Sequence, residues 1–155
     1  MALPLKIEHR VGIQAPAEVI WAFVSDIEGW SRWNPLYPKA SGKLAFGEKL
    51  ELEVALPGQK PQIIRPTITD WTPNEQIIWE LSMFAGLLST KRYIEIESLG
   101  PASCIFSNGE LFEGFMLRFF TRKQRDAIKK GFAAFAETVR TKAEADWQAQ
   151  APAAT

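Results

Sequence analysis

The last long stretch of the chain, residues 122–147, constrains the fold most, because it predicts one long amphipathic helix. Thr121 and Gln124 are spaced as a capping box, in which each side chain satisfies an otherwise unpaired backbone amide at a helix start. At 3.6 residues per turn, one narrow stripe of the helix carries apolar side chains, namely Ile128, Phe132, Phe135, Val139 and Ala143. Such a helix extends about 39 Å, enough to cross a small domain. The stripe must therefore be covered by the elements that precede it.

Two details of this helix predict how far the cover extends. Gly131 flanks the bulky stripe, which predicts a recess in the wall that the helix presents. Lys142 and Asp146 interrupt the stripe, so we expect the apolar contact to end near Ala143.

The N-terminal part predicts one strand followed by two short helices. Apolar and polar residues alternate over residues 5–13, as in a strand with one buried face. Pro16 suits the first position of a helix that ends near Val24. A second short helix around Trp30 ends at Asn34-Pro35, because the residue before a proline is disfavoured in helical geometry.

Alternating apolar residues and turn residues from 39 to 114 predict an antiparallel meander. Pro66 indicates an edge or a bulge in one of its strands. The predicted strands cover residues 44–46, 50–56, 62–71, 76–82, 91–98 and 103–113. The chain therefore reads as a single α+β domain over residues 1–147, and we expect residues 148–155 to form a tail without stable structure.

Charge and composition argue against several classes of function. Lys plus Arg and Asp plus Glu both number 18, so no overall field attracts nucleic acid. One Cys and one His cannot form a zinc site of His and Cys ligands, and no phosphate-binding loop occurs, so we expect no metal and no cofactor. The single Cys104 allows no internal disulfide, and the N-terminus lacks a signal-peptide apolar run. Both features predict a cytoplasmic protein.

Four short motifs resemble one known superfamily. Ala15-Pro16-Ala17-Glu18-Val19-Ile20-Trp21 resembles its opening helix, and Trp30-x-x-Trp33-Asn34-Pro35 resembles its second helix. Glu110-Leu111-Phe112-Glu113-Gly114 resembles the end of its last strand, and Gly131-Phe132 resembles part of its final helix. Together with the order of elements, these motifs make residues 7–147 similar to the START-like, or SRPBCC, superfamily, in its polyketide cyclase/dehydrase and lipid transport branch.

The resemblance implies a helix-grip fold, in which a curved antiparallel sheet of about seven strands grips the last helix around a ligand cavity. Strand parity places Arg92, Asn108 and Glu110 on the inner face of this sheet. Pairing Ile96 with Cys104 across the turn would put Arg92 opposite Asn108 and make Glu110 its diagonal neighbour. We expect ligand contacts from Trp79, Arg92, Ile94, Ile96, Phe106, Asn108, Glu110, Phe112, Phe132, Phe135 and Val139.

His9 has the same inward parity, and in the family the first strand pairs with the last, so it joins Arg92, Asn108 and Glu110 as a polar cluster. These four residues could simply satisfy one another, because an unpaired charge in a cavity is costly. Arg92 or Asn108 could instead bind a polar group of a ligand. Glu110 or His9 could act as a catalytic acid or base, although a Glu paired with an Arg would stay ionised.

We therefore expect a protein that binds or transports a small hydrophobic ligand, such as a lipid, an isoprenoid or a polyketide-like molecule. The family also contains cyclases and dehydratases, so an enzyme that uses Glu110, Arg92 and His9 is the first alternative. A co-chaperone-like protein-interaction module without a ligand is the second.

Residues 115–130 form a further feature. An apolar run, Phe115–Phe120, leads into a segment with six basic residues and one acidic residue between Arg118 and Lys130. The apolar side chains could pack under the corner between strand and helix, form a gate for the ligand, or touch a membrane surface transiently. The apolar loop Met83–Leu88 is a second candidate gate.

Overall fold

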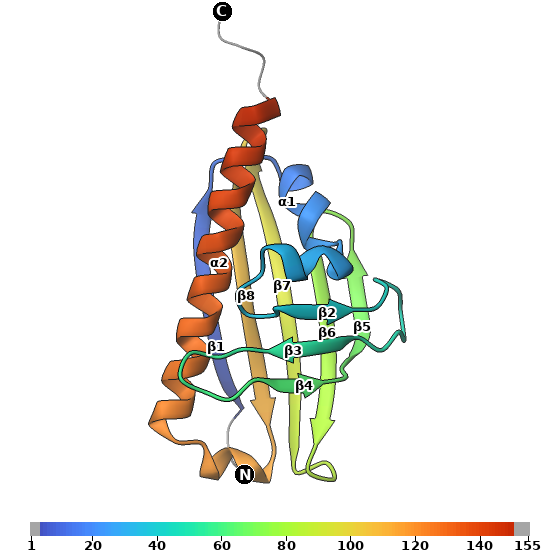
Figure 1. Cartoon of the computed structure of the whole chain (residues 1–155), viewed down its shortest axis with the longest axis vertical. Coiled ribbons are helices and arrows are strands. Elements are labelled where there is room, and N and C mark those ends of the chain that lie inside the picture. The colour runs from blue at the N-terminus through green and yellow to red at the C-terminus, as the bar shows by residue number, and fades with distance from the viewer. Residues whose placement is uncertain (1–3, 151–155) are drawn as a thin grey trace, which may run out of the picture.

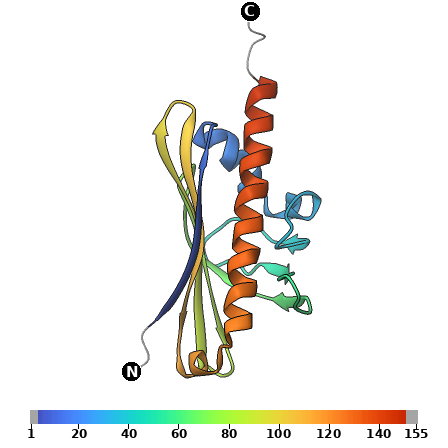
Figure 2. The same ribbon diagram turned by 90° about the vertical axis from the view of Figure 1, so that its left-hand side faces the viewer.

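The computed structural model describes residues 4–150 as an α+β domain in two layers (Figures 1 and 2). One layer is a five-stranded antiparallel sheet, and the other combines the long α2 with a three-stranded sheet and the two short helical segments. The elements in chain order are β1 (Leu5–Ile13), α1 (Ala17–Val24), η1 (Ile27–Arg32), β2 (Lys39–Ser41), β3 (Glu51–Val54), β4 (Gln62–Ile64), β5 (Thr67–Thr72), β6 (Gln76–Met83), β7 (Leu88–Gly100), β8 (Ser103–Glu113), η2 (Phe115–Phe119) and α2 (Arg122–Gln150).

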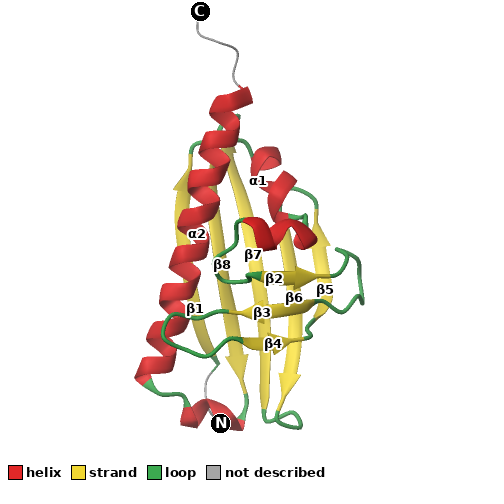
Figure 3. Ribbon diagram, viewed as in Figure 1, coloured by secondary structure: helices red, strands yellow, loops and turns green. Residues whose placement is uncertain are grey.

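The large sheet has the order β1-β8-β7-β6-β5, so the first strand pairs with the last, as the family resemblance implied. Val11 lies opposite Phe106, and Ile13 lies opposite Cys104. The inner face of the large sheet packs against α2. Strands β6 to β8 are longer than the strands of the small sheet and extend past it (Figure 3). The helix-grip fold predicted from the sequence is therefore confirmed.

The three-stranded sheet is the main departure from the expected single sheet of about seven strands. It has the order β2-β3-β4 and crosses the strands of the large sheet on the side of α2 (Figures 1 and 2). Pro66 divides the predicted strand 62–71 into β4 and β5, because proline cannot donate to a strand ladder and is confined to edges and bends. The predicted strand 44–46 was wrong, since these residues lie in a turn between β2 and β3.

The capping box at the start of α2 is confirmed. The Thr121 amide donates to the Gln124 Oε1 at 2.9 Å, and the Gln124 amide donates to the Thr121 Oγ1 at 3.1 Å. All five members of the apolar stripe are buried. Residues 148–150 of the predicted tail are helical instead, and residues 151–155 lie outside the described residues.

The apolar contact of α2 also extends further than predicted. Lys142 turns aside to form an ion pair with Asp146 at 3.4 Å, and its Nζ lies 5.1 Å from the centre of the Phe23 ring. The Lys142 side chain therefore does not interrupt the apolar contact of α2. Trp147 packs against the core one turn beyond Ala143. Within residues 4–150, no helix is long and apolar enough to cross a membrane.

Candidate functional site

The register of β7 against β8 decides which polar residues meet inside the fold. Ile96 lies opposite Phe106, and Arg92 lies directly opposite Glu110. The predicted pairing of Ile96 with Cys104 was therefore wrong by two residues. The cause is that β7 continues to Gly100, so that the turn lies at residues 101–102 and not at the predicted residues 99–101. A shift of two residues keeps every side chain on its face, so the predicted inner face is correct.

Arg92 is buried at the centre of the interior, with only 1% of its surface exposed. Its Nε donates to the Tyr37 hydroxyl at 2.9 Å, and its Nη2 donates to the Asn108 Oδ1 at 2.9 Å. Its Nη1 donates to the backbone carbonyls of Tyr93 and Gly109, both at 3.0 Å. The guanidinium is thus surrounded by neutral acceptors, and no carboxylate lies within 4 Å among the described residues.

Aromatic rings complete the surroundings of this cation. The Arg92 guanidinium carbon lies 4.1 Å from the centre of the Phe132 ring. Cation–π attraction at such a desolvated site is worth about 2 kcal/mol. We define the filled half of the interior as Trp30, Tyr37, Arg92, Phe106, Asn108 and Phe135, whose rings and polar groups contact one another.

Asn108 ties the filled half to two further elements. Its Nδ2 donates to the Phe132 carbonyl of α2 at 3.2 Å and faces the His9 carbonyl of β1 at 3.5 Å. The amide therefore connects β1, β8 and α2 while its oxygen accepts from Arg92. Removing it would leave several buried groups unsatisfied.

An apolar cavity of about 150 Å³ occupies the rest of the interior, toward the β6–β7 loop and η2. We call this region the open half. The residues that line it come from both sheets, from the segments before β2 and after β3, from the junction between η2 and α2, and from α2. They are Leu36, Tyr37, Val54, Leu56, Gln62, Ile64, Trp79, Leu81, Met83, Leu88, Thr90, Glu110, Phe112, Phe120, Ile128 and Phe132. A cavity of this size is large enough for one aromatic ring or a short alkyl chain.

A second pocket of about 140 Å³ adjoins this cavity on the solvent side. Its lining adds the polar residues Gln59, Lys60 and Gln124. The two pockets share the residues Val54, Leu56, Gln62, Phe120 and Ile128. These five side chains form the mouth of the cavity, between the small sheet and the start of α2.

Glu110 is the one carboxyl group among the described residues that line the cavity. Burial raises the pKa of Glu110 above its ordinary value of 4.5, and attraction to Arg92 and the Thr90 hydroxyl offset this only in part. Among the described residues, Glu110 does not form the ion pair with Arg92 that would keep it ionised. The reason is that the hydrogen bonds of Arg92 are taken by Tyr37, Asn108 and two carbonyls.

The structure divides the predicted ligand contacts between the two halves. Trp79, Glu110, Phe112 and Phe132 line the cavity. Arg92, Ile94, Ile96, Phe106, Asn108, Phe135 and Val139 do not line it and belong to the buried interior around the filled half. Sequence reasoning missed the residues of the small sheet and the loop ends, such as Val54, Leu56 and Leu88. Their only signal was an apolar character shared with many core residues.

His9 lies apart from the other members of the predicted polar cluster. It is half-buried on β1, opposite Asn108, while Ile7 lies opposite Glu110. Within residues 4–150, its imidazole makes no hydrogen bond. The structure therefore brings Arg92, Asn108 and Glu110 together and leaves the His9 ring outside that group.

Gly131 does not form the predicted recess. A Cβ atom at this position would lie 2.9 Å from the Leu56 Cδ2 and 3.2 Å from the Leu36 Cδ1. Leu36 and Leu56 thus occupy the space that a side chain at this position would need. Gly131 allows α2 to approach these two residues closely, and the cavity meets α2 at Ile128 and Phe132.

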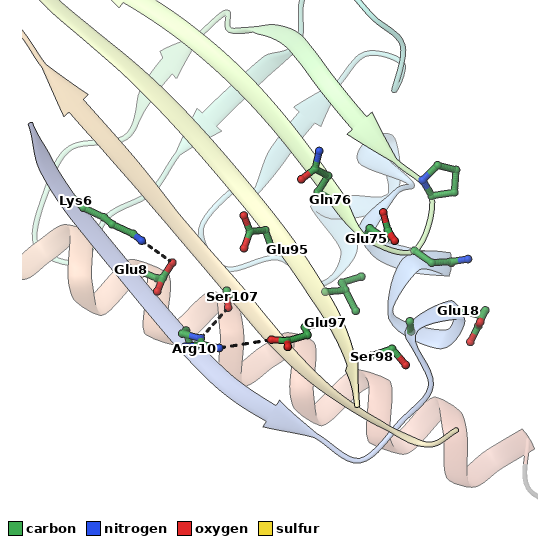
Figure 4. A pocket seen from close by; sticks show the side chains of 14 residues that line it. Lys6, Glu8, Arg10, Glu18, Glu75, Gln76, Glu95, Glu97, Ser98 and Ser107 are labelled. Atoms are coloured by element: carbon green, nitrogen blue, oxygen red, sulfur yellow. Dashed lines mark hydrogen bonds and ion pairs between the residues drawn. The ribbon is translucent and has the colours of Figure 1, made fainter. Parts of the chain in front are cut away.

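A larger hollow of about 890 Å³ lies on the outer face of the five-stranded sheet (Figure 4). Its lining is polar and charged. Arg10 donates from Nε to the Ser107 Oγ at 3.2 Å and forms an ion pair with Glu97 at 3.8 Å. Lys6 pairs with Glu8 at 3.5 Å. Because small-molecule sites are concave and mostly apolar, the inner apolar cavity is a better candidate site than this charged hollow.

Comparison with solved structures supports the fold. The chain is similar to the Zhui aromatase/cyclase from Streptomyces sp. R1128, with a TM-score of 0.74 and 16% identity over 92% of this chain and 94% of that one. It is also similar to a START superfamily protein from Mycobacterium smegmatis, with a TM-score of 0.64 and 22% identity over 94% of this chain and 99% of the other. A point mutant of norcoclaurine synthase from Thalictrum flavum in complex with a transition-state analogue gives a TM-score of 0.63 and 14% identity, over 91% and 94% of the two chains.

Comparison of sequences gives one further result. The family model described as polyketide cyclase/dehydrase and lipid transport matches residues 4–144. No curated protein sequence matches the chain.

Proposed function

Because the chain belongs to the polyketide cyclase/dehydrase and lipid transport family, we propose that it binds a small hydrophobic ligand in the open half of its interior. The observation that carries the proposal is the apolar cavity of about 150 Å³ with one carboxyl group, Glu110, in its wall. A folded domain fills its core at high density, so a void of this size costs stability unless a ligand uses it.

The lining of the cavity favours an amphipathic ligand. Most of the wall is aliphatic or aromatic, which suits one aromatic ring or a short alkyl chain. An isoprenoid or a fused ring system would extend through the mouth into the adjoining outer pocket. Glu110 and the neighbouring Thr90 are the polar groups at the β7–β8 wall. A ligand with a hydroxyl or N–H group directed at Glu110 would satisfy this carboxyl group.

Native mass spectrometry of the protein purified from its own host provides the first test. We expect an apolar molecule to remain bound in a one-to-one complex. Absence of any such species, together with failure to bind the apolar dye N-phenyl-1-naphthylamine in solution, would contradict the proposal.

A matched pair of variants locates the binding site. Leu81→Trp replaces an aliphatic side chain of the cavity wall by a larger indole ring and should reduce dye affinity at least tenfold. We expect a stability cost of about 1–3 kcal/mol. Leu99→Trp makes the same change at an exposed position of the β7–β8 turn and should leave dye affinity unchanged. Equal effects of the two changes would place the dye elsewhere.

A second candidate function is acid catalysis by Glu110, as in a cyclase or dehydratase. The raised pKa of Glu110 favours it, because a carboxyl group that keeps its proton closer to neutral pH can donate it to a carbonyl or a departing hydroxyl. Glu110→Gln should then abolish turnover of a polyketide-like substrate and retain dye binding. If turnover is unchanged by Glu110→Gln and by His9→Ala, the site is not catalytic.

Two further predictions concern protein interaction and cellular location. A protein-interaction module without a ligand would need an interior plugged by Phe and Trp, and only the filled half has that character. The cytoplasmic location stays a prediction, which cell fractionation would test.

A further inference from the structure

Four exposed apolar side chains gather at one end of the molecule. Phe84 and Leu87 lie in the β6–β7 loop with 59% and 46% of their surfaces exposed. Phe115 and Phe119 lie in η2 with 53% and 60% exposed, and their ring centres are 5.9 Å apart. The Met116 amide donates to the Leu87 carbonyl at 3.0 Å, which joins the two segments at the lower end of Figure 1. We call these four residues the apolar tip.

The fold itself gains little from this arrangement. Phe84 has a φ of +55° and Ala85 a φ of +53°, in the left-handed region that L-residues adopt at a cost. The strained turn leaves 59% of the Phe84 surface exposed, so this residue adds little to the core. A contiguous group of exposed aromatic and aliphatic residues marks an interaction surface.

Basic residues surround the apolar tip. Arg118 lies within η2 and covers the Phe115 ring, with its guanidinium carbon 4.9 Å from the ring centre. The first three turns of α2 add the exposed residues Arg122, Lys123, Arg125, Lys129 and Lys130. Within residues 4–150, none of these six forms an ion pair within 4 Å. Their charges are therefore available to an anionic partner.

We propose that the apolar tip and its six basic residues dock the protein on the surface of an anionic lipid bilayer. Aromatic and aliphatic side chains enter the boundary between headgroups and acyl chains, and Lys and Arg bind the anionic headgroups. This inference deepens the proposed function and rests on it, since it names the source of the ligand.

The position of the cavity mouth supports this orientation. Phe120, one residue beyond η2, lines both the cavity and the adjoining outer pocket. Met83 and Leu88, at the two ends of the β6–β7 loop, also line the cavity. A bilayer against the apolar tip would thus lie beside Phe120, one of the residues at the cavity mouth, and an apolar ligand would cross little water.

Vesicle co-sedimentation of the full chain tests docking. We expect the protein to bind vesicles of phosphatidylcholine mixed with phosphatidylserine at least about tenfold more tightly than vesicles of phosphatidylcholine alone. Raising the ionic strength to about 1 M shortens the Debye length to about 3 Å and should remove this preference. Failure to bind the mixed vesicles, or equal binding to both kinds, overturns the proposal.

Matched variants locate the contact. Phe115→Ala with Phe119→Ala should weaken binding to mixed vesicles about tenfold or more. Phe46→Ala with Leu99→Ala removes two residues that are equally exposed, at 65% and 59%, outside the apolar tip, and should have no effect. If both pairs weaken binding alike, the apolar tip is not the docking surface.

A second pair tests the charges. Arg122→Gln with Lys123→Gln should weaken binding to mixed vesicles about fivefold to tenfold. Lys39→Gln with Lys43→Gln removes the same charge from exposed positions in and beside β2, and should change it by less than twofold. Equal losses would indicate a net-charge effect and overturn the assigned surface.

Leu81→Trp separates the two proposals. Because Leu81 lies in the cavity wall and not in the apolar tip, this variant should lose dye binding and retain vesicle binding. If the wild-type protein binds vesicles and no dye or native ligand, the proposed function fails while the docking surface stands. If it binds dye and no vesicles, the reverse holds.

Discussion

The filled half and the open half of the interior are enclosed by the same sheet and the same helix, yet they are built in opposite ways. In the filled half, four neutral acceptors and several rings surround the Arg92 side chain and leave no space. In the open half, aliphatic residues surround a cavity with one carboxyl group, Glu110, in its wall. A single residue separates them along β8, because Asn108 belongs to the first and Glu110 to the second.

This contrast assigns a role to each half. A buried charge that makes four hydrogen bonds fixes the relative positions of the elements that supply its partners. Arg92 and Asn108 link β1, β7, β8, α2 and the Tyr37 segment in this way. The filled half can thus hold the walls of the open half apart. Three comparisons between variants test this division.

The largest effect is expected from Arg92→Ala. This change leaves the Tyr37 hydroxyl, the Asn108 oxygen and two backbone carbonyls without a donor, and each such group costs about 1–3 kcal/mol. The free energy of unfolding in urea should therefore fall by about 4 kcal/mol or more. Arg92→Lys should recover only part of the loss, because an ammonium group cannot reproduce the planar fork.

Arg10→Ala serves as the control for Arg92. Arg10 also contacts two side chains, Ser107 and Glu97, but it lies exposed on the outer face (Figure 4). Its removal should change the free energy of unfolding by no more than about 0.5 kcal/mol. Similar losses for Arg92→Lys and Arg10→Ala would show that the hydrogen bonds of Arg92 do not hold the filled half together.

A smaller effect should distinguish two phenylalanines, one from each half. Phe135 contacts the rings of Trp30, Trp33, Tyr37 and Phe106, and Phe112 borders the cavity and contacts Phe120. Replacement by Ala should cost about 5 kcal/mol at Phe135 and about 3 kcal/mol at Phe112. The difference arises because Phe112 already has empty space on one side. Urea unfolding measures both losses, and a larger loss at Phe112 would contradict the division.

The smallest effect concerns pH. The Glu110 pKa is raised in the folded protein, so the folded state binds the proton more tightly than the unfolded chain. Below the ordinary value of 4.5 both states are protonated, and stability then falls as the pH rises through the raised pKa. The penalty is fully present above that pKa, at about 1.4 kcal/mol per unit of elevation.

Glu110→Gln should remove this fall in stability, which urea unfolding at a series of pH values would measure. Glu113→Gln changes an exposed carboxyl group on the same strand and should retain the wild-type profile. If the Glu110→Gln profile declines in the same way across this range, another titratable group causes the fall in stability and Glu110 does not.

Patterns of short range were predicted well from the sequence. The capping box of Thr121 and Gln124, the buried stripe of α2 and the inward parity of Arg92, Asn108 and Glu110 all depend on local periods. The family was also identified correctly from the motifs. Features that depend on the meeting of distant segments were predicted poorly. The predicted pairing of Ile96 was wrong because the pairing depends on where the turn between β7 and β8 lies.

The sequence by itself determined the long helix and the faces of the strands that look inward, because a period of 3.6 or 2 residues states which side chains share a surface. Only the tertiary structure decided which part of that inner surface is filled. Gly131 is covered because Leu36 and Leu56 come from elsewhere in the chain, and the cavity lies where segments as distant as those of Val54, Leu88 and Phe120 meet. The raised pKa of Glu110 has the same origin, since it results from burial among side chains of these distant segments.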